Sequence, residues 1–204
     1  TLGSGPTEFS ATELEQALLG ENEIISLNAA FKLSHSAQAG NGDALKILAS
    51  AMNTNNADND NTKRYSDNGA RWRIDAAARS AAHGLANLGE PALPALRLLY
   101  KNGSPIARKH AAFALGEIGT LATQNTLLDG LNDPDIHVMI SAVEALGLTP
   151  PTNKATKALI ECLQHSESEV RFDAALSLLR FTANPACVLK GQMTAALSAS
   201  LQDS

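Results

Sequence analysis

The chain has 204 residues, of which 44% are hydrophobic and only 4% aromatic, and its formal net charge is −5. Its apolar residues are mostly Ala and Leu, which favour helices, whereas a β-sandwich would be richer in Val, Ile, Tyr and Thr. The acidic balance argues against a generic nucleic-acid-binding domain. No run approaches the roughly 18 apolar residues of a membrane helix, so no membrane partner is expected.

The predicted elements begin after a tail. Residues 1–10 are interpreted as a disordered tail or a cloning remnant, and residues 11–203 as one repeat domain. A helix near residues 11–19 is expected either to cap the N-terminal end or to be the second helix of a lost repeat. Five pairs of amphipathic helices follow, each with apolar residues at i, i+4, i+8 spacing. The first helices are predicted at residues 22–35, 71–88, 105–118, 134–147 and 167–181, and the second helices at 43–53, 90–102, 120–131, 153–164 and 190–203.

The first helices share one sequence pattern. Residues 107–119 read ARKHAAFALGEIG, and residues 77–89 read AARSAAHGLANLG, at an offset of 30 residues. Two later copies follow at offsets of 31 and 32, and an upstream copy opens at Ile25, 52 residues before the copy at Ala77. Near-constant offsets of this kind are typical of stacked helical repeats, because one hairpin cannot bury its own apolar face.

Local signals mark several helix boundaries. Four helix starts carry capping patterns: Ser104-Pro105 and Asp133-Pro134, each an N-cap before a proline, and Thr12-x-x-Glu15 and Ser166-x-x-Glu169, each a capping box. Three glycines follow the buried stripes, where a helix end or tight turn needs positive φ: Gly89, Gly119 and Gly147.

Periods of 30–32 residues resemble the short HEAT-like repeats first described in phycobilin lyase subunits, and residues 107–119 are the best match. The resemblance covers residues 11–203. It implies an all-α fold, a right-handed α-α superhelix (HEAT-like solenoid) of about five helical hairpins. In such solenoids the second helices usually line the concave side. The partner-binding residues predicted there are Arg97, Tyr100, Lys101, Lys157 and Glu161.

The array is interrupted once, at residues 53–70, where the offset is about 21 residues too long. This segment is rich in Asn, Asp and Thr and is interpreted as a solvated inserted loop. Asp58-x-Asp60-x-Thr62 matches the start of an EF-hand loop. Lys63 and Gly69 then stand where that loop needs glycine and glutamate, so a calcium site is not favoured.

Charge is spread unevenly along the chain. Residues 63–109 carry nine basic and three acidic residues, a charge of +6, and they include Trp72, the only tryptophan. One hypothesis is a local site for an anionic partner, which adds Arg71 and Trp72 to the predicted partner-binding residues. The alternative is that Arg71, Arg73 and Arg79 are solvated residues of one long helix, with Trp72 packed under the insertion.

No catalytic centre, cofactor site or metal site is expected. Acidic residues cluster at helix starts, where the helix dipole accounts for them. Deoxyhypusine hydroxylase, a HEAT-repeat iron enzyme, uses His-Glu pairs in its first helices, and no such dipeptide occurs here. There is no P-loop or nucleophile elbow. Cys162 reads as a core residue and Cys187 as a turn residue, and a cysteine without a placed histidine is a weak nucleophile.

Three functional hypotheses follow. The first is a non-catalytic protein-interaction or scaffold module, part of a larger protein or complex, and either monomeric or a domain of a longer chain. The second is a subunit resembling the phycobilin lyases, which the low aromatic content opposes, because a planar chromophore prefers aromatic walls. The third is nucleic-acid or other polyanion binding through residues 63–109, which the net acidity opposes. The compartment and the identity of the partner stay undetermined.

Overall fold

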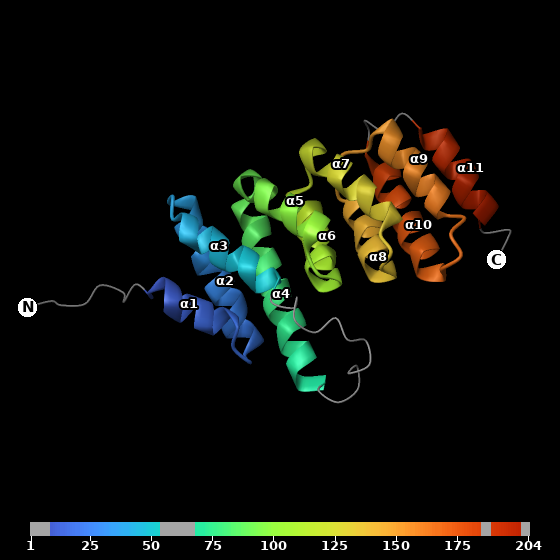
Figure 1. Cartoon of the computed structure of the whole chain (residues 1–204). Coiled ribbons are helices and arrows are strands. Elements are labelled where there is room, and N and C mark those ends of the chain that lie inside the picture. The colour runs from blue at the N-terminus through green and yellow to red at the C-terminus, as the bar shows by residue number, and fades with distance from the viewer. Residues whose placement is uncertain (1–8, 54–67, 185–188, 201–204) are drawn as a thin grey trace, which may run out of the picture. The chain divides into compact units, whose positions relative to one another are not determined.

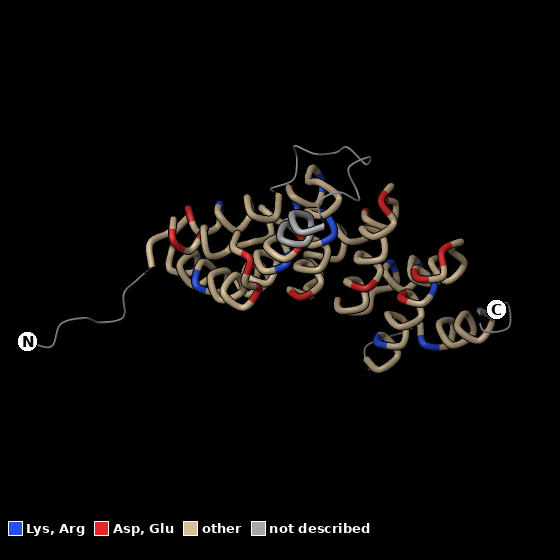
Figure 2. The backbone as a smooth tube through the Cα atoms, turned by 90° about the horizontal axis from the view of Figure 1, so that it is seen from below, with Lys and Arg blue, Asp and Glu red and all other residues tan. Residues whose placement is uncertain are grey.

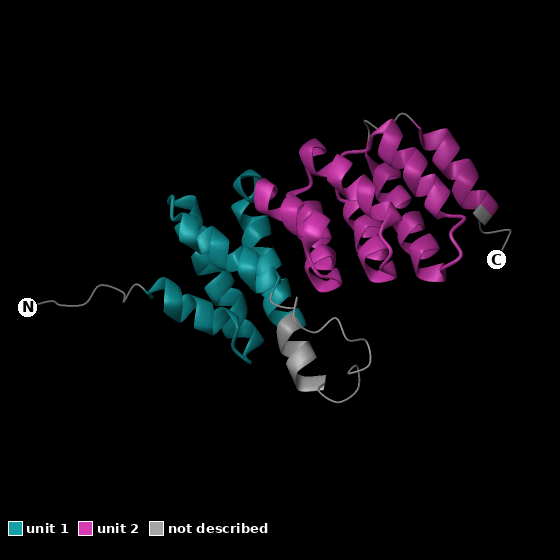
Figure 3. Cartoon of the chain, in the orientation of Figure 1, with its two compact units in different colours: residues 1–92 teal, residues 93–204 magenta. Residues whose placement is uncertain are grey.

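The computed structural model describes residues 9–53, 68–184 and 189–200, with side chains from 75 onward in the second range and to 199 in the third. Every regular element in these ranges is a helix (Figure 1). The all-α prediction is therefore confirmed, and the chain is a solenoid of helical hairpins. It comprises two compact units, residues 1–92 and 93–204 (Figure 3), whereas the sequence predicts one domain, and that prediction stays untested.

The first unit is built around α2. Its elements are α1 (Ala11–Leu18), α2 (Glu23–Gln38), α3 (Gly42–Met52), α4 (Asn68–Leu88) and the 3-10 helix η2 (Glu90–Ala92). Helix α2 packs against α1, α3 and α4, and α3 also packs against α4. Leu33, Leu48 and Leu85 are buried at the centre of this group. The helix predicted near residues 11–19 is present as α1.

The predicted insertion at residues 53–70 is only partly visible. Residues 54–67, which include the calcium-loop candidates Asp58 and Asp60, lie outside the described residues. Helix α4 begins at Asn68, three residues before the predicted start at 71, so the last residues of the predicted loop are helical.

The second unit stacks its helices in two rows. Its elements are α5 (Leu93–Asn102), α6 (Pro105–Ile118), α7 (Leu121–Asp129), the 3-10 helix η3 (Gly130–Asn132), α8 (Ile136–Leu146), α9 (Asn153–Cys162), α10 (Ser168–Ala183) and α11 (Lys190–Ser200). The first helices α6, α8 and α10 pack side by side, and the second helices α5, α7, α9 and α11 lie against them.

The core of this unit repeats with the sequence. One fully buried leucine comes from each of six helices, and each has an exposed fraction of 0%: Leu96, Leu115, Leu127, Leu146, Leu159 and Leu178. Ala111, Ala142 and Ala174, the small residues of the repeat pattern, are also fully buried. The first helices approach closely because small side chains leave room for the neighbouring backbone.

Only some of the predicted boundary signals are used. Ser104 caps α6 by accepting a 3.2 Å hydrogen bond from the amide of Ala107, as predicted. The capping box of α1 is Ser10 with Glu13, not Thr12 with Glu15. Helix α10 begins at Ser168, and its N-cap residue makes no side-chain cap bond, so the predicted Ser166 capping box is also wrong.

Asp133 is not the N-cap of α8. Asp135 takes that place and accepts hydrogen bonds from the amides of His137 and Val138, at 2.9 and 3.3 Å. The carboxylate of Asp133 instead accepts two hydrogen bonds from the Arg108 guanidinium. The prediction fails because a partner 25 residues away competes for the same carboxylate.

Two of the three repeat glycines adopt the expected backbone conformation. Gly89 and Gly119 have φ of 75° and 61°, in the left-handed region that glycine favours. Gly147 has φ of −64°, so no special conformation requires it. A Cβ atom at Gly147 would lie 2.7 Å from the Cβ of Ser177 in α10, and this close helix approach is the reason for a glycine there.

Candidate functional site

The second helices of the second unit present an exposed face with a regular pattern. Three pairs at i, i+4 spacing, one pair per helix, point away from the core, and all six residues are exposed: Pro94 and Leu98 on α5, Asn125 and Asp129 on α7, Lys157 and Glu161 on α9. Each pair brackets one of the fully buried leucines Leu96, Leu127 and Leu159, which point the opposite way. We call these six residues the outer face.

Hydrogen bonds between neighbouring helices hold this surface together. The Arg97 guanidinium on α5 donates a 2.8 Å hydrogen bond to the carbonyl of Ala122 on α7. The Lys154 amine on α9 donates a 3.3 Å hydrogen bond to the side-chain oxygen of Asn125 on α7. Both contacts join adjacent repeats, so the outer face runs without interruption from α5 to α9.

A buried amide fixes the register of α7 against α9. The Gln124 amide nitrogen donates to the hydroxyl of Thr149 and the carbonyl of Pro150, both at 2.8 Å, and its oxygen accepts a 2.6 Å bond from Thr152. Gln124 is 5% exposed, so these bonds compete with little water. The arrangement pre-organises the outer face, which lowers the entropy lost when a partner binds.

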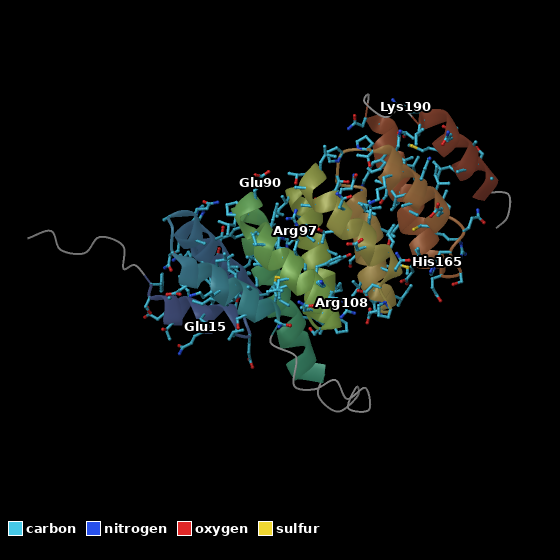
Figure 4. The ribbon with its side chains drawn as sticks, turned by 45° about the horizontal axis from the view of Figure 1, so that its top comes forward. Glu15, Glu90, Arg97, Arg108, His165 and Lys190 are labelled. Atoms are coloured by element: carbon cyan, nitrogen blue, oxygen red, sulfur yellow. The ribbon has the colours of Figure 1, made fainter. Side chains whose placement is uncertain are left out.

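Four predicted partner-binding residues lie on this surface. Lys157 and Glu161 belong to the outer face itself, and Arg97 and Lys101 are exposed on the flank of α5. Arg97 is labelled in Figure 4, where it projects between its own helix and α7. Whether any of these four residues contacts a partner stays a prediction.

Tyr100, the fifth residue predicted on the second helices, is not on the surface. Its side chain is buried, with 7% exposed, and its hydroxyl end lies against Gly130 of η3. Burial, followed by the charges of Asp133 and Asp129, raises the pKa of the phenol. Tyr100 stands four residues after Leu96 and so continues the buried stripe, a signal that the sequence already contained.

Two arginines of the basic segment, residues 63–109, form ion pairs with carboxylates of this chain. Arg79 forms ion pairs with Glu23 at 3.0 Å and Asp75 at 3.5 Å. Arg108, which is labelled in Figure 4, forms a two-point pair with Asp133, with nitrogen–oxygen distances of 2.8 and 2.9 Å. Along the described backbone, basic and acidic residues are scattered among one another (Figure 2).

The two remaining predicted residues, Arg71 and Trp72, lie in the first turns of α4. Their side chains fall outside the described residues, so the predicted anionic site around them stays untested.

Side chains that could bind a metal ion are those of His, Cys, Asp and Glu, and a cysteine acts as a nucleophile when its thiol is ionised. Within these residues, no three His, Cys, Asp or Glu side chains are grouped so that they could hold a metal ion. Cys162 is half-buried, and burial, with a smaller effect of Glu161, raises the pKa of its thiol to about 11. The corresponding thiolate is scarce at neutral pH. Cys187 lies outside the described residues. Across the described helices, none is long and apolar enough to cross a membrane.

Comparison with known families identifies the repeats of the second unit. The family model of HEAT repeats matches residues 93–180. Over these residues the chain is similar to HEAT repeats. The match spans α5 to α10, the same helices that carry the repeated leucines, and the predicted resemblance to HEAT-like repeat proteins is confirmed. No curated protein matches the sequence.

Solved structures of repeat proteins share the fold over most of the chain. The CpcE–CpcF complex of phycocyanin lyase from Nostoc sp. PCC7120 is similar with a TM-score of 0.52 at 22% identity, over 91% of this chain and 69% of that one. A designed armadillo repeat protein in complex with the peptide (KR)4 has a TM-score of 0.52 at 18% identity, over 96% and 91%.

A computationally designed armadillo repeat protein for modular peptide recognition has a TM-score of 0.51 at 20% identity, over 95% of this chain and 91% of that one. At these identities the similarities show the solenoid fold alone.

Proposed function

We propose that this chain is a non-catalytic repeat scaffold that binds a protein segment across the outer face of α5, α7 and α9. The observation that carries the proposal is the outer face itself. Its six residues recur at equivalent positions of three HEAT repeats, and contacts between the repeats hold them in one surface. A stack of rigid repeats with exposed side chains in register suits an extended partner, which can contact several repeats at once.

The charges on and beside the outer face favour a partner that carries both positive and negative charges. Lys154 and Lys157 lie on the same helix as Glu161, and Asp129 stands one repeat earlier at the position equivalent to Glu161. Acidic residues therefore stand at equivalent positions of α7 and α9, whereas the two lysines lie on α9 alone. A segment carrying both signs of charge complements this surface better than a uniformly charged polymer does.

Peptide binding by similar folds supports the choice of a protein partner. One designed armadillo protein of similar fold is bound to the peptide (KR)4, and another is designed for modular peptide recognition. The polyanion alternative is weaker, because Arg79 and Arg108 of the basic segment are engaged by carboxylates of this chain.

The phycobilin-lyase-like alternative rests on similarity of fold to the CpcE–CpcF complex alone. Leu98 is the only large apolar side chain among the six residues of the outer face, and a planar chromophore needs more apolar wall than that. Titration of the chain with a free bilin tests this alternative directly. A saturable shift of the bilin absorbance bands would favour it over the scaffold function.

Affinity capture followed by targeted substitution tests the scaffold function. The full chain is immobilised, partners are captured from lysate of the source organism, and the affinity of each purified partner is measured by calorimetry. A triple variant of the outer face, Asn125→Ala with Lys157→Ala and Glu161→Ala, is expected to weaken binding tenfold or more, about 1.4 kcal/mol.

The matched control changes exposed side chains of the first helices, Glu117→Ala with Glu144→Ala, and is expected to leave the affinity unchanged. Equal affinity of the triple variant and the wild type for every captured partner would show that the outer face is not the binding site.

A further inference from the structure

Helix α10 carries an apolar stripe on its exposed side. Phe172, Leu176 and Leu179 have exposed fractions of 64%, 37% and 52%, although large apolar side chains are usually buried. Their spacing of four and three residues places them on one side of the helix. The opposite side, which includes Val170 and Leu178, is fully buried. Helix α10 is therefore apolar on both sides, and only one side is covered by the described residues.

The exposed stripe faces the direction in which the array is stacked. In α6, Gly116 lies against Ala145 of α8, and in α8, Gly147 lies against Ser177 of α10. At the repeat offsets of 31 and 32 residues, Leu179 is the next member of the series that contains Gly116 and Gly147. Leu179 thus lies on the side of α10 that each preceding repeat uses to contact its successor.

A further repeat in the same register does not fit this side. A single Cβ atom at Gly147 would already lie 2.7 Å from the Cβ of Ser177 and 2.8 Å from its Cα, so the stacked helices meet almost backbone to backbone. A leucine at the equivalent position holds a neighbouring helix further away. Protruding side chains in a row instead suit the wider spacing of interdigitating helices, about 8–10 Å between axes.

The same side of α10 is complementary to itself. Its N-terminal half carries the acidic residues Glu169 and Asp173, and its C-terminal half carries the exposed Arg180. In an antiparallel pair related by a twofold axis near Leu176, each Phe172 lies beside Leu179 of the second copy. The same twofold brings each Glu169 close to Arg180 of the second copy, so two apolar contacts and two opposite-charge contacts form at once.

Two features of the N-terminal half fit this pairing. A shallow hollow lined by Ser168, Glu169, Phe172 and Asp173 can receive the leucine of a second copy. Burial and the nearby carboxylates of Glu144 and Glu169 raise the pKa of Asp173, while Arg180 lowers it. The acidic residues here repel one another, and the guanidinium of a second copy would relieve that repulsion.

We propose that the stripe Phe172, Leu176 and Leu179 is a self-association surface, on which two copies of this chain pair through antiparallel α10 helices about a twofold axis. One helix pair buries less area than a standard protein interface, so the dimer is expected to be weak, with a dissociation constant on the order of 10–100 µM. This surface lies on a first helix and leaves the outer face of the second helices free.

Sedimentation equilibrium of the full chain, from about 5 to 500 µM, tests the proposal. The wild type is expected to show a reversible monomer–dimer equilibrium. Leu176→Glu is expected to weaken association at least tenfold, because it places two carboxylates on the twofold axis. Leu179→Ala, a milder change at a surface residue, is expected to weaken it several-fold. Circular dichroism of each variant confirms that the helices are retained.

Two further variants separate this pairing from other contacts. Leu121→Glu removes another exposed leucine, 58% exposed on α7, and is expected to leave the dimer unchanged. Glu169→Arg and Arg180→Glu should each weaken association, and combining them should restore part of it. A monomer at the highest concentration, a dimer insensitive to Leu176→Glu, or growth beyond dimers into open chains would overturn the proposal.

Discussion

Gly147 at the end of α8 lies against Ser177 of α10, and the Ser177 hydroxyl donates a 3.0 Å hydrogen bond to the carbonyl of Val143 one turn earlier. Ser177 is fully buried. The glycine of α8 lets α10 approach closely, and the hydroxyl on α10 satisfies a backbone carbonyl of α8 at the point where the two repeats meet. This contact repeats the approach of Gly116 to Ala145 one repeat earlier.

Replacement of Gly147 by alanine is expected to destabilise the chain although its φ of −64° suits any residue. The added methyl group overlaps Ser177 and forces α8 and α10 apart, at a cost of about 1–3 kcal/mol. Urea denaturation followed by circular dichroism measures the change. Gly191→Ala on α11, where no atom lies within 4 Å of the new methyl group, is the control and should be neutral or slightly stabilising. Equal stability of the two variants would refute a packing role for Gly147.

Tyr100 and Gly130 are expected to be energetically coupled. The Tyr100 hydroxyl is buried and makes no hydrogen bond to the described residues, so Tyr100→Phe should be neutral or stabilising. Gly130→Ala should be destabilising by about 2 kcal/mol, because its methyl group would overlap that hydroxyl. In the Tyr100→Phe background the cost of Gly130→Ala should fall by about 1 kcal/mol. A double-mutant cycle by urea denaturation measures this coupling, and strictly additive effects would contradict it.

The same tyrosine predicts a loss of stability at alkaline pH. Burial raises the pKa of Tyr100 above its unfolded value of about 10, so the native state resists losing the proton. The contribution of the neutral phenol to folding stability is therefore fully present below pH 10, and it is lost as the pH rises above 10. Thermal unfolding between pH 8 and pH 11 should show a smaller loss for Tyr100→Phe than for the wild type. Parallel curves for the two proteins would argue against this ionisation.

The ion pair of Arg108 with Asp133 is expected to contribute more than the exposed pairs. Its side chains are 17% and 11% exposed, and the carboxylate accepts two guanidinium bonds. Asp133→Asn should destabilise the chain by about 1–2 kcal/mol. Lys46→Met, which removes the pair with Asp43 at 80% and 75% exposure, should cost less than about 0.5 kcal/mol. Chemical denaturation compares the two variants, and a smaller effect at Asp133 than at Lys46 would disprove the ranking.

Cys162 is expected to react slowly while the chain is folded. With its pKa raised to about 11 by burial, only about one thiol in a thousand is ionised at pH 8. Alkylation by iodoacetamide, followed site by site with mass spectrometry, should be at least about 100-fold slower in the native chain than in urea. Labelling at equal rates in both states would show that partial burial does not suppress ionisation of the thiol.

The sequence alone determined the repeat architecture, because helix periodicity and capping act over a few residues. The predicted helix at residues 105–118 coincides with α6, and the leucines that recur every 31 and 32 residues are the fully buried core. The exposure of Lys157 and Glu161 followed from the same periodicity. The same periodicity accounts for the burial of Tyr100, which stands four residues after Leu96.

Only the tertiary structure decided which residues of different repeats meet. Asp133 suits an N-cap in its local sequence, yet its carboxylate pairs with Arg108 of α6, the first helix of the preceding repeat. Gly147 resembles a turn glycine, yet the backbone of α10 is the reason that a side chain does not fit there. Leu179 appears as one more core leucine of an amphipathic helix, and only its exposed place at the edge of α10 makes it a candidate contact. Contacts between repeats depend on helix positions in space, which local periodicity does not encode.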